Sequence, residues 1–278
     1  MIILDTKLMP PLWRWAIRIG VVLLWAALMA AAIRYRWHQS STYKDAVKRE
    51  EAHAYFKERC KSSGVFIYKK ISGENTLYLI NRRPNGQATL AEHGASGQYT
   101  VIDPYGWDFD PSRGGDYSLH ILTYLGLPNV PPLPVPFKAI EVIDDRDGNL
   151  YRHTGVMAPV TKEGRIVYQV QQDSRIKINS VTARYGLQFE DISTLDDRSK
   201  WVAGSALKVI DLMTKEVVAV RVGYLWDSGM GVTAAGRIPW IEAENHACPS
   251  FEPRSYGRLT SRDGQSARFA SQVLNPTN

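Results

Sequence analysis

The sequence predicts an α+β protein in which an N-terminal transmembrane helix and a juxtamembrane helix precede a mainly antiparallel β body. Three observations predict this order. An apolar run from Trp15 to Ile33 contains one charge. Residues 40–64 place apolar side chains at three- and four-residue spacing. Beyond residue 137, alternating apolar and polar positions are separated by turn residues.

The apolar run has the length and the flanks of a membrane anchor. At about 1.5 Å per residue its helix spans roughly 28 Å, which matches the hydrocarbon core of a bilayer. Arg18 lies one turn inside the boundary, where its long stem reaches back to the interface. Aromatic residues suited to the headgroup region stand at both ends: Trp13, Trp15, Tyr35 and Trp37. We therefore expect the lipid bilayer as a partner.

A cleavable signal peptide is the main alternative. Lys7, Arg14 and Arg18 precede an apolar stretch at 19–29, and the three alanines at 30–32 fit a cleavage site. Cleavage would give a secreted periplasmic protein and would leave the second aromatic pair on a soluble tail. We favour the retained anchor because cleavage would give these aromatic residues no role. A third interpretation is a buried helix of a soluble protein.

Charge argues against nucleic acid as a partner. Residues 1–37 carry five Lys/Arg and one Asp, so only +2 of the net charge of +6 belongs to the rest of the chain. This remainder lacks the concentrated positive face of a nucleic-acid-binding domain. Basic residues flank the apolar run on both sides, so charge does not decide its orientation.

We expect five regions along the chain. They are an N-terminal tail with the anchor (1–37), a region with the juxtamembrane helix, a hairpin and an Asp/aromatic loop (38–126), a Pro-rich crossing (127–137), an antiparallel β region (138–248) and a poorly ordered tail (249–278). The second and fourth regions are expected to form one body.

Local signals predict the elements of the first half of this body. The helix is capped by Thr42, ends at Gly64 and docks through the stripe Ala52, Tyr55, Phe56 and Cys60. Strands at 65–71 and 76–81 flank "SGEN" as a hairpin, and 99–102 resembles a strand. The segment 117–127 fits a short helix that ends at Gly126.

Turn signals predict the pairing in the second half. Two alternating runs surround Asp147-Gly148, which is a hairpin signal. "TKEGR" joins two further runs, and 201–226 is a long strand pair that turns near Thr214-Lys215. The sheet in this half is therefore predicted to be antiparallel.

The loop "DPYGWDFDPSRGGD" at 103–116 is the main candidate for a functional site. Its aromatic residues Tyr105, Trp107 and Phe109 are the predicted partner-binding residues. A weaker alternative pairs Asp108 or Asp110 with Asp116 as catalytic carboxylates. The Asp-Pro turn signals favour a third interpretation, in which the segment is a packed structural loop. The order of acidic residues fits no calcium-loop template and the histidines lack metal-ligand spacing, so we expect no metal and no cofactor.

Two cysteines, Cys60 and Cys248, are too few for a disulfide framework and lack the C-x-x-C spacing of a metal site. One bridge between them would close almost the whole body into a loop, contributing roughly 5 kcal/mol in the chain-entropy model. It would also indicate an oxidising compartment. The alternatives are two unrelated buried thiols, or a nucleophile pair formed by His246 and Cys248.

Five blocks taken together carry a resemblance: "FKERCKSSGVFIYKKI", "DPYGWD", "ARYGLQFEDIST", "WVAGSALKVIDL" and "GRIPWIEAENHACP". Over about residues 56–248 the chain resembles an uncharacterised group of bacterial membrane-anchored or exported proteins. The resemblance implies a bacterial origin and an envelope location, and it makes Cys60 and Cys248 attractive as a pair. It implies no activity and no active site.

The sequence therefore predicts a single-pass bacterial inner-membrane protein with a periplasmic body. We expect it to act by binding, as an accessory or assembly component of an envelope complex with a protein partner, rather than as an enzyme. Three alternatives remain: a membrane-tethered hydrolase of an envelope polymer that uses the paired aspartates, a cleaved periplasmic protein, and a cytoplasmic body with free thiols.

Overall fold

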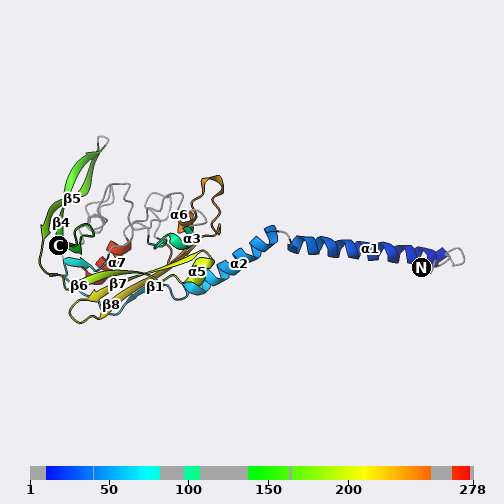
Figure 1. Cartoon of the computed structure of the whole chain (residues 1–278), viewed down its shortest axis with the longest axis horizontal. Helices are drawn as coiled ribbons and strands as arrows, with labels where there is room; N and C mark the ends of the chain where they lie inside the picture. The colour runs from blue at the N-terminus through cyan, green and yellow to red at the C-terminus, as the bar shows by residue number, and fades with distance from the viewer. Residues whose placement is uncertain are drawn as a thin grey trace. The chain divides into compact units, whose positions relative to one another are not determined.

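The computed structural model describes residues 11–39, 41–81, 97–106, 137–162, 165–251 and 265–275. The chain divides into two compact units, 1–51 and 52–278. An apolar helix and a second helix precede a mixed, mostly antiparallel sheet of nine strands in the described residues (Figure 1). The α+β class predicted from the sequence is confirmed.

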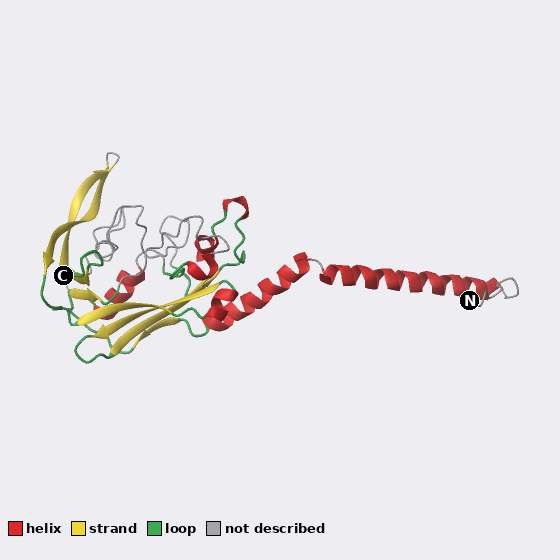
Figure 2. Cartoon of the chain, viewed as in Figure 1, coloured by secondary structure: helices red, strands yellow, loops and turns green. Residues whose placement is uncertain are grey.

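The two long helices occupy the N-terminal part of the chain (Figure 2). Helix α1 runs from Pro11 to Gln39 and helix α2 from Ser41 to Cys60. The boundary between the units falls within α2. Beyond it, Ala52 and Phe56 are buried and Tyr55 and Cys60 are half-buried, so the apolar stripe predicted for this helix is confirmed.

Nine strands form one sheet in the order β1-β8-β7-β6-β2-β3-β4-β5, with β9 also paired to β8. Strand β2 is parallel to both of its neighbours, and every other pair is antiparallel. The bounds are Gly64–Ile67 (β1), Thr76–Leu79 (β2), Ala139–Ile143 (β3), Leu150–Lys162 (β4), Arg165–Lys177 (β5), Tyr185–Asp191 (β6), Val202–Asp211 (β7), Val217–Trp226 (β8) and Ala247–Cys248 (β9).

The N-terminal hairpin predicted around "SGEN" is wrong. Strand β1 pairs with β8, and β2 lies between β3 and β6. Leu77 and Leu79 of β2 are fully buried, so a central position in the sheet outweighs the local turn signal. The later hairpins are confirmed: Gly148 and Lys215 have positive φ in the turns between β3 and β4 and between β7 and β8.

Two short strands share one edge of β8. Strand β1 pairs with residues 219–222 of β8, and β9 pairs with Tyr224 and Leu225. The two strands therefore lie one after the other along the same edge, because β7 occupies the opposite edge over the full length of β8.

Helices cover both faces of the central strands. Ala203 and Leu225 face one side, together with Trp240 of α6 (Pro239–Glu242). Val202 and Trp226 face the other side, against α2. Figure 1 shows α3 (Gly97–Thr100), α6 and α7 (Gln265–Leu274) on the same side of the sheet. The remaining short elements are α5 (Leu195–Ser199), η3 (Ala234–Gly236) and η4 (Ala243–Asn245).

Helix α7 contradicts the prediction of a poorly ordered tail at 249–278. It runs from Gln265 to Leu274. Five of its buried residues belong to the main core: Ala267, Phe269, Ala270, Val273 and Leu274. The expectation failed because two of the inward positions are alanine, and because Ser, Arg, Pro and Gly dominate the flanking composition.

Three further predictions concern residues 99–137, of which only part is described. The strand predicted at 99–102 is wrong, since residues 97–100 form α3. The short helix predicted at 117–127 lies outside the described residues, as does the Pro-rich crossing apart from Phe137, which is fully buried in the main core.

A buried carboxylate connects β3 to β4 and to the segment that precedes β6. Glu141 of β3 is fully buried and accepts hydrogen bonds from Arg152 of β4 (2.7 Å), from the Thr182 backbone and hydroxyl, and from the Ala183 N–H (3.0 Å). Burial alone would raise the pKa of Glu141, but these hydrogen bonds and the arginine outweigh it and lower the pKa. The folded protein therefore favours the ionised form.

We expect Phe269→Ala to reduce the free energy of unfolding by about 3–5 kcal/mol, because it leaves a cavity between α7 and the sheet. Gln272→Ala, at an exposed position of the same helix, is the control and should change it by less than about 0.5 kcal/mol. Equilibrium unfolding followed by tryptophan fluorescence measures both. Equal effects would contradict the packing of α7.

We expect Glu141→Gln to destabilise the fold at neutral pH by about 1.5–3 kcal/mol, since an amide N–H₂ would replace one carboxylate oxygen and would face either Arg152 or the N–H donors of residues 182 and 183. The pKa of Glu141 is lowered on folding, so its contribution is present above its usual pKa and is lost as the pH falls through the folded value. Wild type should therefore lose more stability than the variant between about pH 6 and pH 3.

Thermal unfolding across this pH range is the measurement. Glu190→Gln is the control, because the Glu190 carboxylate is exposed and pairs with Lys208 at the surface. The role assigned to Glu141 fails if the two variants have the same pH dependence.

Candidate functional site

Helix α1 presents an exposed apolar surface. The 22 residues from Trp15 to Arg36 are long and apolar enough to cross a membrane, and none of them is buried. The rings of Trp13, Trp15 and Tyr35 are 66%, 64% and 68% exposed. The side chain of Trp37, the fourth predicted interface residue, lies outside the described ones. A surface of this kind is typical of a signal sequence or a membrane anchor.

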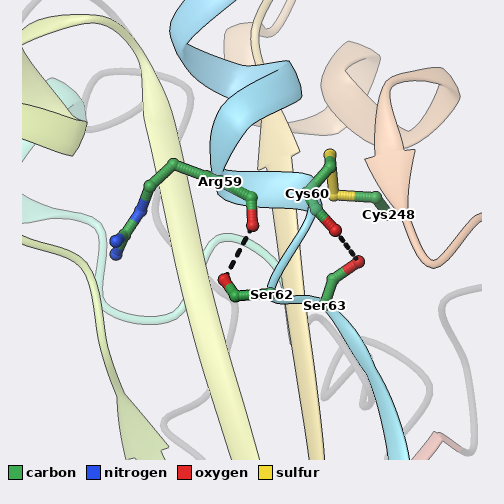
Figure 3. The surroundings of a disulfide bond; sticks show 5 residues. All are labelled: Arg59, Cys60, Ser62, Ser63 and Cys248. Atoms are coloured by element: carbon green, nitrogen blue, oxygen red, sulfur yellow. Dashed lines mark hydrogen bonds between the residues drawn. A yellow bond between two sulfur atoms is a disulfide. The ribbon is translucent and has the colours of Figure 1, made fainter.

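A disulfide joins the end of α2 to β9 (Figure 3). Cys60 and Cys248 are 188 residues apart in the chain, and their Cα atoms are 5.6 Å apart. The helix ends at this bond, where the Ser62 hydroxyl donates to the Arg59 carbonyl and the Ser63 hydroxyl donates to the Cys60 carbonyl, each at 2.8 Å. The bonded sulfur of Cys248 is not available as a nucleophile.

Aromatic packing surrounds the disulfide. Trp226 at the end of β8 stacks on His53 of α2, with ring centroids 4.7 Å apart, and meets the edge of His246 at 5.4 Å. Burial lowers the pKa of His246, and the neighbouring His53 adds to this effect. His246 therefore packs at the junction of α2, β8 and β9, and the Cys248 sulfur with which it could have formed a nucleophile pair is held in the disulfide.

An ion pair on α2 supports the same junction. The Arg59 Nε lies 2.9 Å from Oδ1 of Asp197, whose carboxylate is fully buried and also accepts from the Thr194 N–H at 2.7 Å. Burial, followed by the hydrogen bond to Asp197, raises the pKa of Tyr55 to about 12. The Arg59 Nη2 group also donates to Oδ2 of Asp197 at 3.1 Å, so these contacts connect the end of α2 to α5.

The Asp/aromatic loop is only partly described. Trp107 and Phe109, like the alternative catalytic residues Asp108, Asp110 and Asp116, lie outside the described residues. Tyr105 is described and is 1% exposed, with its ring 5.1 Å from that of Phe251. The expectation of a surface contact at Tyr105 is therefore wrong, because its ring fills the core between β8 and residue 251.

Arginines neutralise five buried carboxylates among the described residues. The pairs are Glu141 with Arg152, Asp144 with Arg146 and Arg175, Asp197 with Arg59, Asp211 with Arg184, and Asp227 with Arg237. For Glu141 and Asp211, hydrogen bonds that include an arginine lower the pKa of the carboxyl group in spite of desolvation, so these two groups favour the ionised form. Within the described ranges, no group of three His, Cys, Asp or Glu side chains could hold a metal ion.

A cleft of about 190 Å³ lies beside β8 on the side of the sheet that faces α7. Apolar side chains form part of its wall: Val65, Phe251 and Phe269. Two arginines and two glutamines also line it, and the described lining contains no carboxylate. Such a lining offers hydrogen-bond donors and positive charge to a ligand.

The Arg221 guanidinium is positioned by two side chains, Tyr105 and Gln265. The guanidinium lies 5.5 Å from the centre of the Tyr105 ring and donates from Nη1 to Oε1 of Gln265. Gly223, two residues further along β8, makes room for Tyr105, because a Cβ at that position would lie 2.1 Å from its Cζ. Tyr105 therefore holds the arginine in place beside the cleft.

Sequence reasoning did not identify Arg221, Gln265 or Arg268. A signal exists for Arg221, since in "AVRVGYL" it occupies the same face of the strand as Ala219 and Leu225, both of which are buried. A charge at an inward strand position indicates a special environment. Gln265 and Arg268 belong to α7, which was not predicted.

Comparisons of the chain with protein-family models, with curated proteins and with solved structures find no match. Function is therefore inferred from three features of the described residues: the exposed apolar helix, the disulfide and the cleft.

We expect the double variant Cys60→Ser/Cys248→Ser to be about 2–5 kcal/mol less stable than the oxidised protein, because the bond closes a loop of nearly the whole body. Thermal unfolding with and without a reductant is the measurement. Reductant should lower the melting temperature of wild type and leave that of the double variant unchanged. A double variant as stable as oxidised wild type would show that the bond does not constrain the fold.

Proposed function

We propose that this protein is a single-pass, inner-membrane-anchored component of the bacterial cell envelope whose body lies in the periplasm. It acts by binding, as an accessory or assembly part of an envelope complex. The observation that carries the proposal is the Cys60–Cys248 disulfide in a chain that begins with an exposed apolar helix. Disulfides persist in oxidising compartments, and the periplasm is the one that adjoins the inner membrane.

The extent of α1 supports a retained anchor. At about 1.5 Å per residue, the 22 residues from Trp15 to Arg36 span roughly 33 Å, enough for a hydrocarbon core of about 30 Å. The exposed rings of Trp15 and Tyr35 lie near its two ends, at the depth where amphipathic aromatics are most stable. The helix continues through Ala30–Ala32 to Gln39 without interruption.

The cleft beside β8 supports binding as the activity. Its arginine and glutamine side chains come from β8 and α7, two elements that both contribute residues to the main core. Convergent polar groups within an apolar wall are typical of ligand sites.

We expect the full-length polypeptide, carrying a C-terminal tag, to remain in the membrane pellet after alkaline carbonate extraction of bacterial membranes. An anchor held by hydrophobic burial resists this wash, whereas a peripheral protein is released. Immunoblotting measures the location and the apparent mass. Release of the full-length chain would contradict the anchor, and a product shortened by about 30 residues would identify a cleaved signal peptide instead.

The orientation is tested in the same cells. With Cys60→Ser, the remaining thiol of Cys248 should react in spheroplasts with a maleimide that does not cross membranes, while a cytoplasmic protein with an exposed cysteine should not. Labelling of Cys248 only after the membrane is permeabilised would place the body in the cytoplasm.

A further inference from the structure

We propose that the cleft between β8 and the N-terminus of α7 is a binding site for an oxyanion, a carboxylate or a phosphate group, carried on a molecule with an apolar part. The ligand would be held by Arg221, Gln265 and Arg268. This inference deepens the binding role and rests on that part of the proposed function.

Arg221 is the first observation. The guanidinium groups of Arg59, Arg152 and Arg237 are paired with buried carboxylates. Arg221 is half-buried on an inward position of β8, and its contacts among the described residues are a glutamine oxygen and a tyrosine ring, both uncharged. A partly desolvated cation without an anion is unfavourable, and a bound oxyanion would remove that cost.

Gln265 is the second and independent observation. It is 4% exposed, and its Nε2 is buried with no hydrogen-bond partner in the described part of the chain. Arg221 can only donate, so the amide oxygen must face Arg221 and the N–H₂ group must point elsewhere. Because Gln265 lines the cleft, the unpartnered donor belongs to the same site as Arg221.

Helix α7 adds to the positive character of the site. Gln265 is its first residue, and the helix is ten residues long, so the positive end of its dipole lies at this end. Arg268, three residues further on, is one turn away and also lines the cleft. The positive groups therefore come from two elements and meet at one place.

The volume of the cleft and its apolar side chains limit the class of ligand that it can bind. A volume of about 190 Å³ is below the roughly 300–1,000 Å³ of sites that enclose a whole drug-sized ligand, so the cleft would receive one end of a molecule. Phe251 and Phe269 supply apolar contact beside the donors. Oxyanions on an apolar carrier occur both on small soluble molecules and on lipid headgroups, and the test separates these two sources.

The test uses the full-length chain in uncharged detergent micelles at pH 7. Calorimetric titration and thermal unfolding are measured with benzoate, with inorganic phosphate, and with dihexanoyl phosphatidylglycerol. Benzamide, sodium chloride of equal ionic strength and dihexanoyl phosphatidylcholine are the uncharged, non-specific and zwitterionic controls. We expect saturable binding of at least one oxyanion probe and none of its control. Binding of phosphatidylglycerol alone would identify a lipid headgroup, and binding of benzoate or phosphate a soluble ligand.

Gln265→Glu is the decisive variant. It retains an acceptor for Arg221 but replaces the N–H₂ donor with a negative oxygen, so the side chain itself would occupy the site as a carboxylate. We expect it to melt no lower than wild type and to bind the probe at least about tenfold more weakly. Loss of binding without loss of stability cannot be attributed to misfolding.

Arg268→Gln should also weaken binding about tenfold. Lys208→Gln, which removes one positive charge from the opposite face of the sheet, should leave the affinity unchanged. The site is overturned if no probe binds saturably, if Gln265→Glu binds as well as wild type, or if Lys208→Gln weakens binding as much as Arg268→Gln. None of these results would bear on the membrane anchor, which is tested separately by extraction.

Discussion

The bond between Cys60 and Cys248 is the constraint on which the rest of the body depends. Strand β9 has only two residues, and a strand of that length has little stability of its own. The disulfide holds it at the edge of β8, next to β1, while Trp226 is packed between His53 and His246 at the same place. The chain that leaves β9 continues directly into Pro249 and Phe251, which form a wall of the cleft. The shape of the cleft thus depends on a covalent link made at the end of α2.

Arginine has two roles in this body. At Glu141, Asp144, Asp197, Asp211 and Asp227 it neutralises a carboxylate that burial would otherwise make costly, and so it joins strands, loops and helices. At position 221 the same side chain is held by neutral groups. Gly223 admits the Tyr105 ring, and the ring and Gln265 then fix the guanidinium. The tyrosine that the sequence suggested as a surface contact therefore acts from the interior, by positioning a charge.

Patterns within a short stretch of sequence correctly predicted the helices and turns that form from neighbouring residues. The apolar run from Trp15 to Ile33 predicted α1, the stripe from Ala52 to Cys60 predicted the buried face of α2, and Asp147-Gly148 predicted a hairpin. The failures concern long-range partners. "SGEN" is typical of a turn. However, β2 pairs with β3 and β6, whose partner residues lie more than 60 positions later in the chain, and this pairing places β2 in the centre of the sheet. The cleft was missed for the same reason, since Arg221 and Gln265 meet only after α7 has folded back onto β8.

A link between residues 60 and 248 also makes the polypeptide between them a covalent ring. One backbone cut within that ring, by a protease or by chemical damage, would leave two fragments still connected through sulfur. Both fragments would stay with α1, because Cys60 lies on the N-terminal fragment and carries the other one. The body could therefore be cut once without losing its covalent connection to α1.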